Sequence, residues 1–207
     1  MPEVALVLYG VYLAVAVVGR MLVQWRRTGS TGFHGVGGRP GSVEWLAGVG
    51  FALALVAGAA APVLALEDVV EPIGALDTGA VHAAGLVLSI GGIAATLGAQ
   101  LAMGDSWRVG VDPRERTELV TSGPFALVRN PIYAATLPSA LGLALLVPSW
   151  VALAALAGLV LAVEVLVRRV EEPYLVRTHG EAYTGYAARV GRFVPGVGRL
   201  RALRTTR

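Results

Sequence analysis

Five apolar runs, each near the length that a lipid bilayer requires, dominate the sequence; they cover residues 4–23, 43–66, 81–103, 132–147 and 150–167. A helix that crosses a membrane needs about 20 mainly apolar residues. The last two runs are separated only by Pro148 and Ser149, which predicts a helical hairpin. The pattern therefore predicts an all-α fold, a polytopic transmembrane helix bundle of about five spans.

The composition agrees with a membrane protein. Of the 207 residues, 55% are hydrophobic and only 15% are charged, whereas soluble domains carry about 25% charged residues. At this length we expect residues 1–207 to form one integral membrane domain. The chain has no cysteine, and His34, His82 and His179 lack the spacing of metal ligands, so we expect no metal site. The expected partners are membrane lipids and a lipophilic small molecule, with no nucleic acid.

The charges of the connecting loops indicate the orientation. All 17 basic residues are arginine, and the second connection carries Glu67, Asp68, Glu71 and Asp77 but no arginine. Arginine gathers in the first and third connections and after the fifth run. Because arginine-rich loops stay in the cytoplasm, we expect an outside N-terminus and a cytoplasmic C-terminus, in a bacterial cytoplasmic membrane. The last arginines are expected to attract anionic lipid headgroups: Arg199, Arg201, Arg204 and Arg207.

Polar side chains near the ends of the spans are candidate functional residues, because they are costly inside a bilayer. Along the third run, polar or small residues recur every fourth position, which places them on one helical face: Gly92, Thr96, Gln100, Gly104 and Arg108. Close helix packing explains Gly92 and Thr96. For Gln100 and Arg108 both packing and function stay open.

The end of the fifth run carries a second group. Glu164 and Arg168 form an i,i+4 pair in the favourable order, which a structural role could explain. Glu171 and Glu172 are adjacent carboxylates that repel each other, so we interpret them as ligands for a cation or for a polyhydroxylated group such as a ribose.

Between these groups, Pro131 is expected at the first turn of the fourth helix, where its missing N–H costs nothing. The exposed amides of that helix start would suit a cofactor that bears a carboxylate.

The segment from Gly123 to Tyr133 reads G-P-F-A-L-V-R-N-P-I-Y and resembles the G-P-[YF]-x-x-x-R-H-P-x-Y motif of the isoprenylcysteine carboxyl methyltransferase and phospholipid methyltransferase families. Residues 171–195 are similar to their second block, E-E-x-x-L … G-x-x-Y-x-x-Y … R-F-x-P, and residues 100–108 resemble the segment before the first block. The resemblance covers about half of the chain. Asn130 replaces the family histidine, and Gly98-Ala99-Gln100 lacks the G-x-G of the phospholipid enzymes.

The resemblance implies an S-adenosylmethionine-dependent methyltransferase that acts on a lipophilic acceptor, possibly a carboxylate, at the cytoplasmic face. It implies that residues 1–80 hold the first two helices and that residues 81–207 form the catalytic part, with a small C-terminal cofactor-binding region. The implied cofactor-binding residues are Gln100, Arg129, Asn130, Pro131, Tyr133, Glu171, His179 and Tyr183. Arg168 would hold the acceptor, oriented by Glu164 or Glu172.

Two other interpretations compete with this one. NADPH-dependent sterol or enone reductases of membranes resemble the same C-terminal layout, with a block R-H-P-N-Y-x-G-E. Here Tyr133 is followed by Ala134-Ala135, with no Gly-Glu. A membrane scaffold with an arginine-rich face is the non-enzymatic alternative. It leaves Glu171-Glu172 and the R-N-P-x-Y segment unexplained.

The charge alternation predicts where each loop lies. We expect reporter fusions at Asp77 to report the outside and fusions at Arg204 to report the cytoplasm, because the second connection is acidic and lacks arginine, whereas arginines follow the fifth run. Fusions that report the cytoplasm at both positions would contradict the five-span topology.

Overall fold

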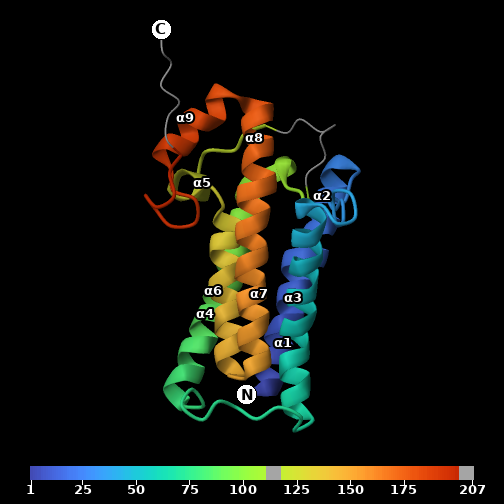
Figure 1. Ribbon diagram of the computed structural model, residues 1–207, viewed down its shortest axis with the longest axis vertical. Helices are drawn as coiled ribbons and strands as arrows, with labels where there is room; N and C mark the ends of the chain where they lie inside the picture. Colours follow the sequence, from blue (N-terminus) through green and yellow to red (C-terminus); the bar gives the residue numbers. More distant parts are fainter. Residues whose placement is uncertain (111–117, 201–207) are drawn as a thin grey trace.

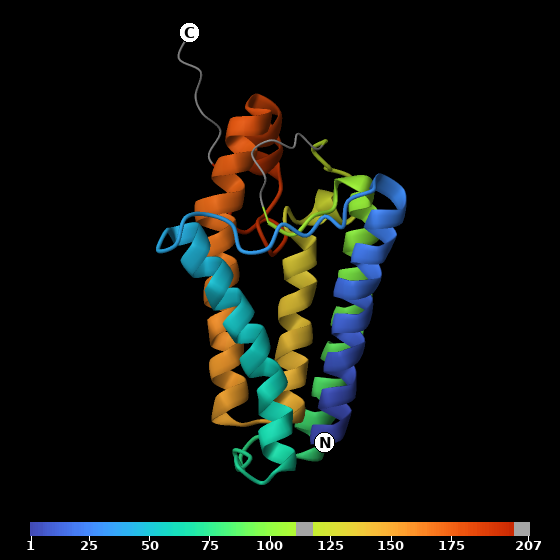
Figure 2. The ribbon, with the colours of Figure 1, turned by 90° about the vertical axis from the view of Figure 1, so that its right-hand side faces the viewer.

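The computed structural model describes residues 1–110 and 118–200. Five of the arginines discussed above lie outside the described residues: Arg114, Arg116, Arg201, Arg204 and Arg207. The described part is all-helical, and its long helices stand side by side in one elongated bundle (Figures 1 and 2). Four are long and apolar enough to cross a membrane, and a shorter apolar helix lies among them. This confirms the predicted helix bundle.

The first span is one continuous helical rod, Pro2–Thr28, of 27 residues. It consists of α1 (Pro2–Tyr12), a π-helical stretch η1 (Leu13–Gly19) and α2 (Arg20–Thr28). The rod ends at Gly29, whose φ of 77° suits a residue without a side chain. It extends beyond the apolar run 4–23 because polar residues on one face of α2 contact the rest of the protein.

The next two helices begin at hydroxyl caps. The Ser42 hydroxyl accepts a bond from the amide of Trp45 at the start of α3 (Val43–Leu66), and Thr78 caps α4 (Gly79–Met103) in the same way. After α4 the chain turns at Gly104 (φ 57°) into a short 3₁₀ turn, η2 (Gly104–Ser106). The prediction that Gly104 and Arg108 continue the helical face of Gln100 is therefore wrong, because the helix ends before them.

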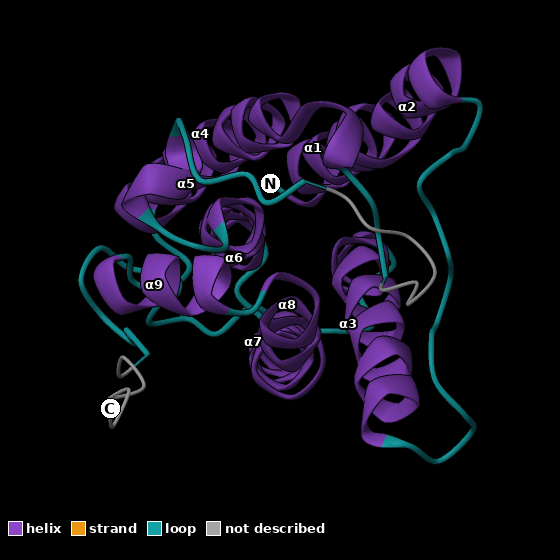
Figure 3. Cartoon of the chain, turned by 90° about the horizontal axis from the view of Figure 1, so that it is seen from above, coloured by secondary structure: helices purple, strands orange, loops and turns teal. Residues whose placement is uncertain are grey.

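The C-terminal half supplies the remaining helices. A single turn, α5 (Pro124–Leu127), precedes α6 (Pro131–Leu146), which has Pro131 in its first turn as predicted. The hairpin partner of α6 is a second rod of 30 residues, Trp150–His179. It comprises α7 (Trp150–Val165), the π-helical η3 (Leu166–Glu171) and α8 (Glu172–His179), so it runs well beyond the predicted end at residue 167. Seen from above, α9 (Glu181–Arg189) lies across this end of the bundle (Figure 3).

The two ends of the bundle differ in charge. The N-terminus, the acidic α3–α4 connection and the α6–α7 turn lie at one end (Figure 2). The α2–α3 connection, α8 and α9 lie at the other, which carries the arginines of the described connections. The alternation predicted from the loops is thus present in the fold.

Helices α4 and α6 make the most extensive helix contact, with α3 against α7 next. Small residues permit the close approach of α4 and α6. A Cβ added to Gly92 would lie 2.7 Å from the amide nitrogen of Ser139, and one added to Gly142 would lie 2.5 Å from that of Ser89. Such contacts are too short for any side chain to fit without movement of a backbone. The predicted packing role of Gly92 and Thr96 agrees with their burial.

We expect Gly92→Ala to destabilise the bundle by about 1–3 kcal/mol, because the methyl group would overlap the backbone of α6. Gly91→Ala is the matched control, since a Cβ there would meet nothing within 4 Å. Thermal unfolding in detergent compares the two variants. Equal melting temperatures would contradict close α4–α6 packing as a source of stability.

Candidate active site

A buried ion-pair cluster lies where α6, α8 and α9 meet. The carboxylate of Glu172, whose side chain is 8% exposed, accepts a hydrogen bond from Arg129 Nη2 at 2.5 Å. Arg192 donates to both carboxylate oxygens, from Nε and from Nη2, at 2.8 Å each. One anion is thus held by two cations, and the forked pairing with Arg192 fixes its orientation.

Arg129 also binds the backbone of the last turn of α9 and of the segment that follows it. Its guanidinium donates to the carbonyl oxygens of Ala187 (3.2 Å), Val190 (2.5 Å) and Gly198 (3.1 Å). These carbonyls follow α9 or belong to its last turn, where the helix itself no longer supplies amides for them. The Ala187 carbonyl also accepts a bond from the amide of Leu200 at 3.0 Å. The Arg129 side chain, just before α6, therefore fixes the position of a segment about 60 residues further along the chain.

The backbone strengthens this connection. The amide of Arg129 donates to the carbonyl of Gly191 at 2.8 Å, and the amide of Asn130 donates to that of Arg192 at 3.1 Å. The Asn130 side chain reaches the same Arg192 carbonyl at 3.2 Å. The R-N-P segment and the R-F-x-P segment, which lie far apart in the sequence, thus pair side by side. The side-chain amide of Asn130 acts here as a hydrogen-bond donor, a role that does not require a titratable side chain.

Glu171 has different surroundings from its neighbour. Tyr133 of α6 donates its hydroxyl to Glu171 Oε1 at 2.8 Å. Successive residues of a helix point about 100° apart, so the two carboxylates face different partners. Each carboxylate is therefore stabilised by its own partners, although the charge of Glu172 still acts on Glu171. The π-helical η3 ends at Glu171, and such interruptions occur frequently at functional sites.

Arg108 approaches the same place from the segment after α4. Its Nη2 lies 3.4 Å from the hydroxyl of Tyr174, and the guanidinium carbon lies 5.4 Å from the centre of the Tyr174 ring. The positive charge of Arg108 also acts on Glu171. Three elements therefore bring Arg108, Tyr133, Glu171 and Tyr174 together beside the Glu172 cluster.

The electrostatics of the cluster follow from these contacts. Hydrogen bonds to Glu172 raise the pKa of the Arg192 guanidinium above its usual value, so this group stays charged. Burial raises the pKa of Tyr183 to about 12, and the charge of Glu172 acts in the same direction. Tyr183 is therefore a neutral phenol at ordinary pH, packed against the ring of Tyr186.

Other residues implicated by the sequence lie apart from this group. Arg168 is half-exposed and pairs with Glu164 on the same helix, as the i,i+4 spacing predicts. Gln100 is buried and donates to the carbonyl of Ala16 at 2.8 Å, so its amide joins α4 to the first rod. His179 ends α8 and is partly exposed.

Two arginines were given no role from the sequence. Arg192 lies within the resembling block, and the signal that could have singled it out is the need of two buried carboxylates for counter-charges. Arg20 stands inside the apolar run 4–23. A lone arginine there is itself a signal of function.

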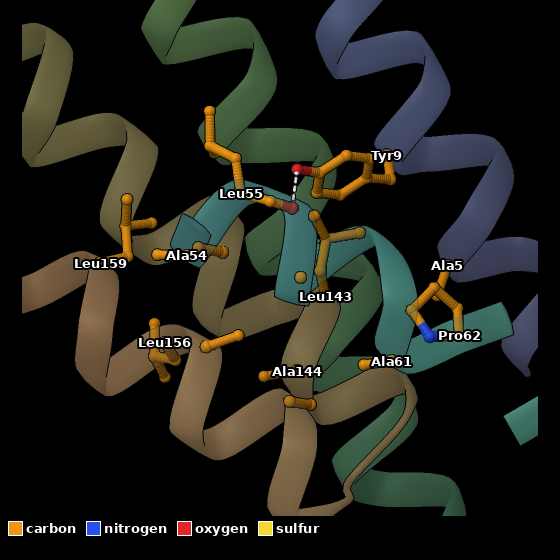
Figure 4. Close-up of a pocket in the computed structure, with 14 residues that line it drawn as sticks. Ala5, Tyr9, Ala54, Leu55, Ala61, Pro62, Leu143, Ala144, Leu156 and Leu159 are labelled. Carbon is orange, nitrogen blue, oxygen red and sulfur yellow. Dashed lines mark hydrogen bonds between the residues drawn. The ribbon is translucent and has the colours of Figure 1, made fainter. Parts of the chain in front are cut away.

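The interior also contains an apolar cavity nearer the opposite end of the bundle (Figure 4). Residues of α1, α3, α6 and α7 line it, among them Tyr9, Leu55, Leu143 and Leu156. The Tyr9 hydroxyl donates to the carbonyl of Leu55 at 2.6 Å, so the cavity offers no free polar group there. Its volume is about 50 Å³, whereas sites for small molecules enclose about 300–1,000 Å³. This cavity is too small to be a cofactor site.

The polar end has the chemistry that a charged cofactor needs. Glu171 provides a carboxylate for hydroxyl groups or a positive charge. No side chain caps the start of α6, so its first amides can face an anionic group. Within residues 1–110 and 118–200 no cluster of histidine, aspartate and glutamate could hold a metal ion. The residues present therefore fit S-adenosylmethionine, which carries a sulfonium, a carboxylate and ribose hydroxyls.

The middle and C-terminal part of the chain matches a known protein family. Residues 80–182 match the family described as phospholipid methyltransferase. The matched region includes α4, the R-N-P segment, α6, the Trp150–His179 rod and the start of α9. No curated protein matched the chain.

We expect Glu172→Gln to destabilise the protein by about 3–5 kcal/mol, because it leaves two buried cations without their anion. Glu171→Gln is the matched control one residue away. It keeps an oxygen that can accept the Tyr133 bond, so its melting temperature should stay near that of the wild type. Melting temperatures in detergent test the difference. Similar decreases in melting temperature for both variants would mean that the ion pairs of Glu172 contribute no more to stability than the hydrogen bond of Glu171 does.

Proposed function

Since residues 80–182 belong to the phospholipid methyltransferase family of integral membrane methyltransferases, we propose that this protein transfers a methyl group from S-adenosylmethionine to a lipophilic acceptor. We place the reaction at the arginine-rich end of the bundle and assign this end to the cytoplasmic face. The observation that carries the proposal is the convergence of Glu171, Tyr133 and Arg108 at this end, inside the matched region. The family match favours a methyltransferase over a reductase.

In this proposal the Glu172 cluster is a frame. Both Glu172 oxygens are bonded to arginines, and Arg129 is surrounded by carbonyls and a carboxylate. The frame fixes the start of α6 and the segment that follows α9, where the cofactor would lie. Glu171 would bind the ribose hydroxyls or the amino group, and the first amides of α6 would face the carboxylate. His179 and Tyr183 would border the same space.

The cofactor supplies, when bound, a methyl group on a positively charged sulfur. The residues of the chain need to align the acceptor atom with that methyl group and to exclude water. For a carboxylate acceptor no general base is required, because its negative charge is lost as the new bond forms. An amine or phenol acceptor would release a proton, and Glu171 is the carboxylate that we assign to accept it.

The cofactor assignment predicts a specific pattern of stabilisation. S-adenosylhomocysteine should stabilise the purified protein by about 2.7 kcal/mol at a hundredfold excess over Kd. Glu171→Gln should weaken that effect at least tenfold in Kd, because the amide loses the charge that the cofactor contacts. Thermal shift in detergent measures both.

NADPH serves as the competing ligand in the same assay. A clear shift with NADPH and none with S-adenosylhomocysteine would point to the reductase. No shift with either ligand would favour the scaffold. Isotope-labelled S-adenosylmethionine incubated with lipid extract, followed by mass spectrometry, then identifies the methylated acceptor.

We further propose that Arg168 holds the acceptor, since it directly follows the apolar run 150–167 and lies one turn beyond Glu164. Arg168→Ala should then lower methyl transfer strongly and leave cofactor affinity near normal. Arg168→Lys should restore little, because lysine lacks the forked geometry.

A purely structural Glu164–Arg168 pair gives a different pattern. The Arg168 side chain is half-exposed and the Glu164 side chain is one-third exposed. Arg168→Ala and Glu164→Ala would therefore both lower the melting temperature slightly and by similar amounts. If Arg168→Ala keeps near-normal turnover, Arg108 becomes the residue that faces the acceptor.

A further inference from the structure

The first rod, which lies outside the matched residues 80–182, reaches into the segment that carries Arg108. Arg20 is 4% exposed, and its Nη2 donates to the carbonyl of Gly104 at 2.5 Å. Its guanidinium lies 4.7 Å from the centre of the Trp107 ring. One turn later, Gln24 donates to the carbonyl of Asp105 at 2.7 Å. Two side chains of α2 thus bind successive carbonyls at the end of α4.

The connection after α2 holds the same segment from its other end. The amide of Val109 donates to the carbonyl of Gly32 at 2.7 Å, and the amide of His34 donates to that of Val109 at 3.1 Å. Gly32 packs so closely that an added Cβ would lie 2.9 Å from the carbonyl oxygen of Trp107. Residues 104–109 are therefore held at both ends by contacts with the N-terminal part of the chain.

Arg108 lies within this segment, one residue before its end. Its neighbour Trp107 is buried against Arg20, whereas Arg108 itself meets Tyr174 and acts on Glu171. The position of Arg108 at the candidate site consequently depends on contacts that α2 makes on the other side of Trp107.

These contacts are a costly way to stabilise a fold. Within the described residues Arg20 forms no salt bridge, and its Nε and Nη1 have no hydrogen-bond partner. The side-chain oxygens of Gln24 and Gln100 also lack partners. The charge of Asp105 acts on Arg20, but the two form no salt bridge. A buried cation without a bonded anion costs free energy, and an apolar side chain of similar size is often more stable in its place. Stability alone does not explain arginine at this position.

We propose that Arg20 and Gln24 are positioning residues: they hold residues 104–109 so that Arg108 faces Tyr174 and Glu171. This role rests on the proposed methyl transfer at that site. It gives the first rod, which the family match does not cover, a part in the reaction.

The decisive variant is Arg20→Met, which keeps the length of the side chain but removes the charge and the bond to Gly104. We expect its melting temperature to equal or exceed that of the wild type, while turnover at saturating substrates falls about tenfold to a hundredfold, as expected for a displaced active-site group. Arg20→Lys should recover part of the turnover, because an ammonium can still donate to Gly104 and face Trp107. Arg26→Met is the matched control on the exposed side of the same helix and should keep normal turnover.

Limited trypsin digestion gives a readout that needs no activity. The wild type should resist cleavage after Arg108, and Arg20→Met should be cleaved there several times faster, as mass spectrometry of the fragments would show. Equal cleavage, or a turnover that falls only together with the melting temperature, would overturn the proposal. A wild type that binds no S-adenosylhomocysteine would instead refute the proposed function, and the digestion would still judge whether α2 holds the segment.

Discussion

The active end of this protein depends on one buried carboxylate. Glu172 needs its two arginines because a lone charge away from water would cost several kcal/mol, and each arginine is itself fixed by the chain segment that carries it. Arg129 comes from the start of α6 and Arg192 from the segment after α9. Removing the carboxylate would loosen both at once. The adjacent Glu171 takes no part in these ion pairs and accepts its bond from Tyr133 instead.

The apolar part of the bundle has a different task. Its tightest contact, between α4 and α6, is built from glycine and serine, which allow backbones to approach where no water contributes a hydrophobic driving force. A contact made by backbones is stiff, since there are few side-chain rotamers to change. It fixes the end of α4 relative to the start of α6. Tyr133 of α6 bonds to Glu171, and Arg108 lies in the segment that follows α4.

Sequence patterns predicted the spans well because hydrophobic length is a strong, local signal. Residues 43–66 match α3 at both ends, and Pro131 marks the start of α6. The paired roles within Glu171-Glu172 were not predictable, since they depend on which helix lies on each side. The spacing predicts Arg108 on the helical face of Gln100, but the helix ends before it because Gly104 adopts a positive φ, and a glycine in a glycine-rich helix gives no warning of that. Arg20 was missed because its partners are carbonyl oxygens, which every sequence possesses.

The backbone bond between Arg129 and Gly191 has a consequence for biosynthesis. All the helices of the bundle emerge from the ribosome before Arg192 does, so a nascent chain can insert its spans while the charge of Glu172 is still only partly compensated. The carbonyl of Gly198, which binds Arg129, arrives later still. Assembly of the polar end therefore has to follow synthesis of the membrane-spanning helices. A chain interrupted between them would be inserted in the bilayer yet lack a completed polar end.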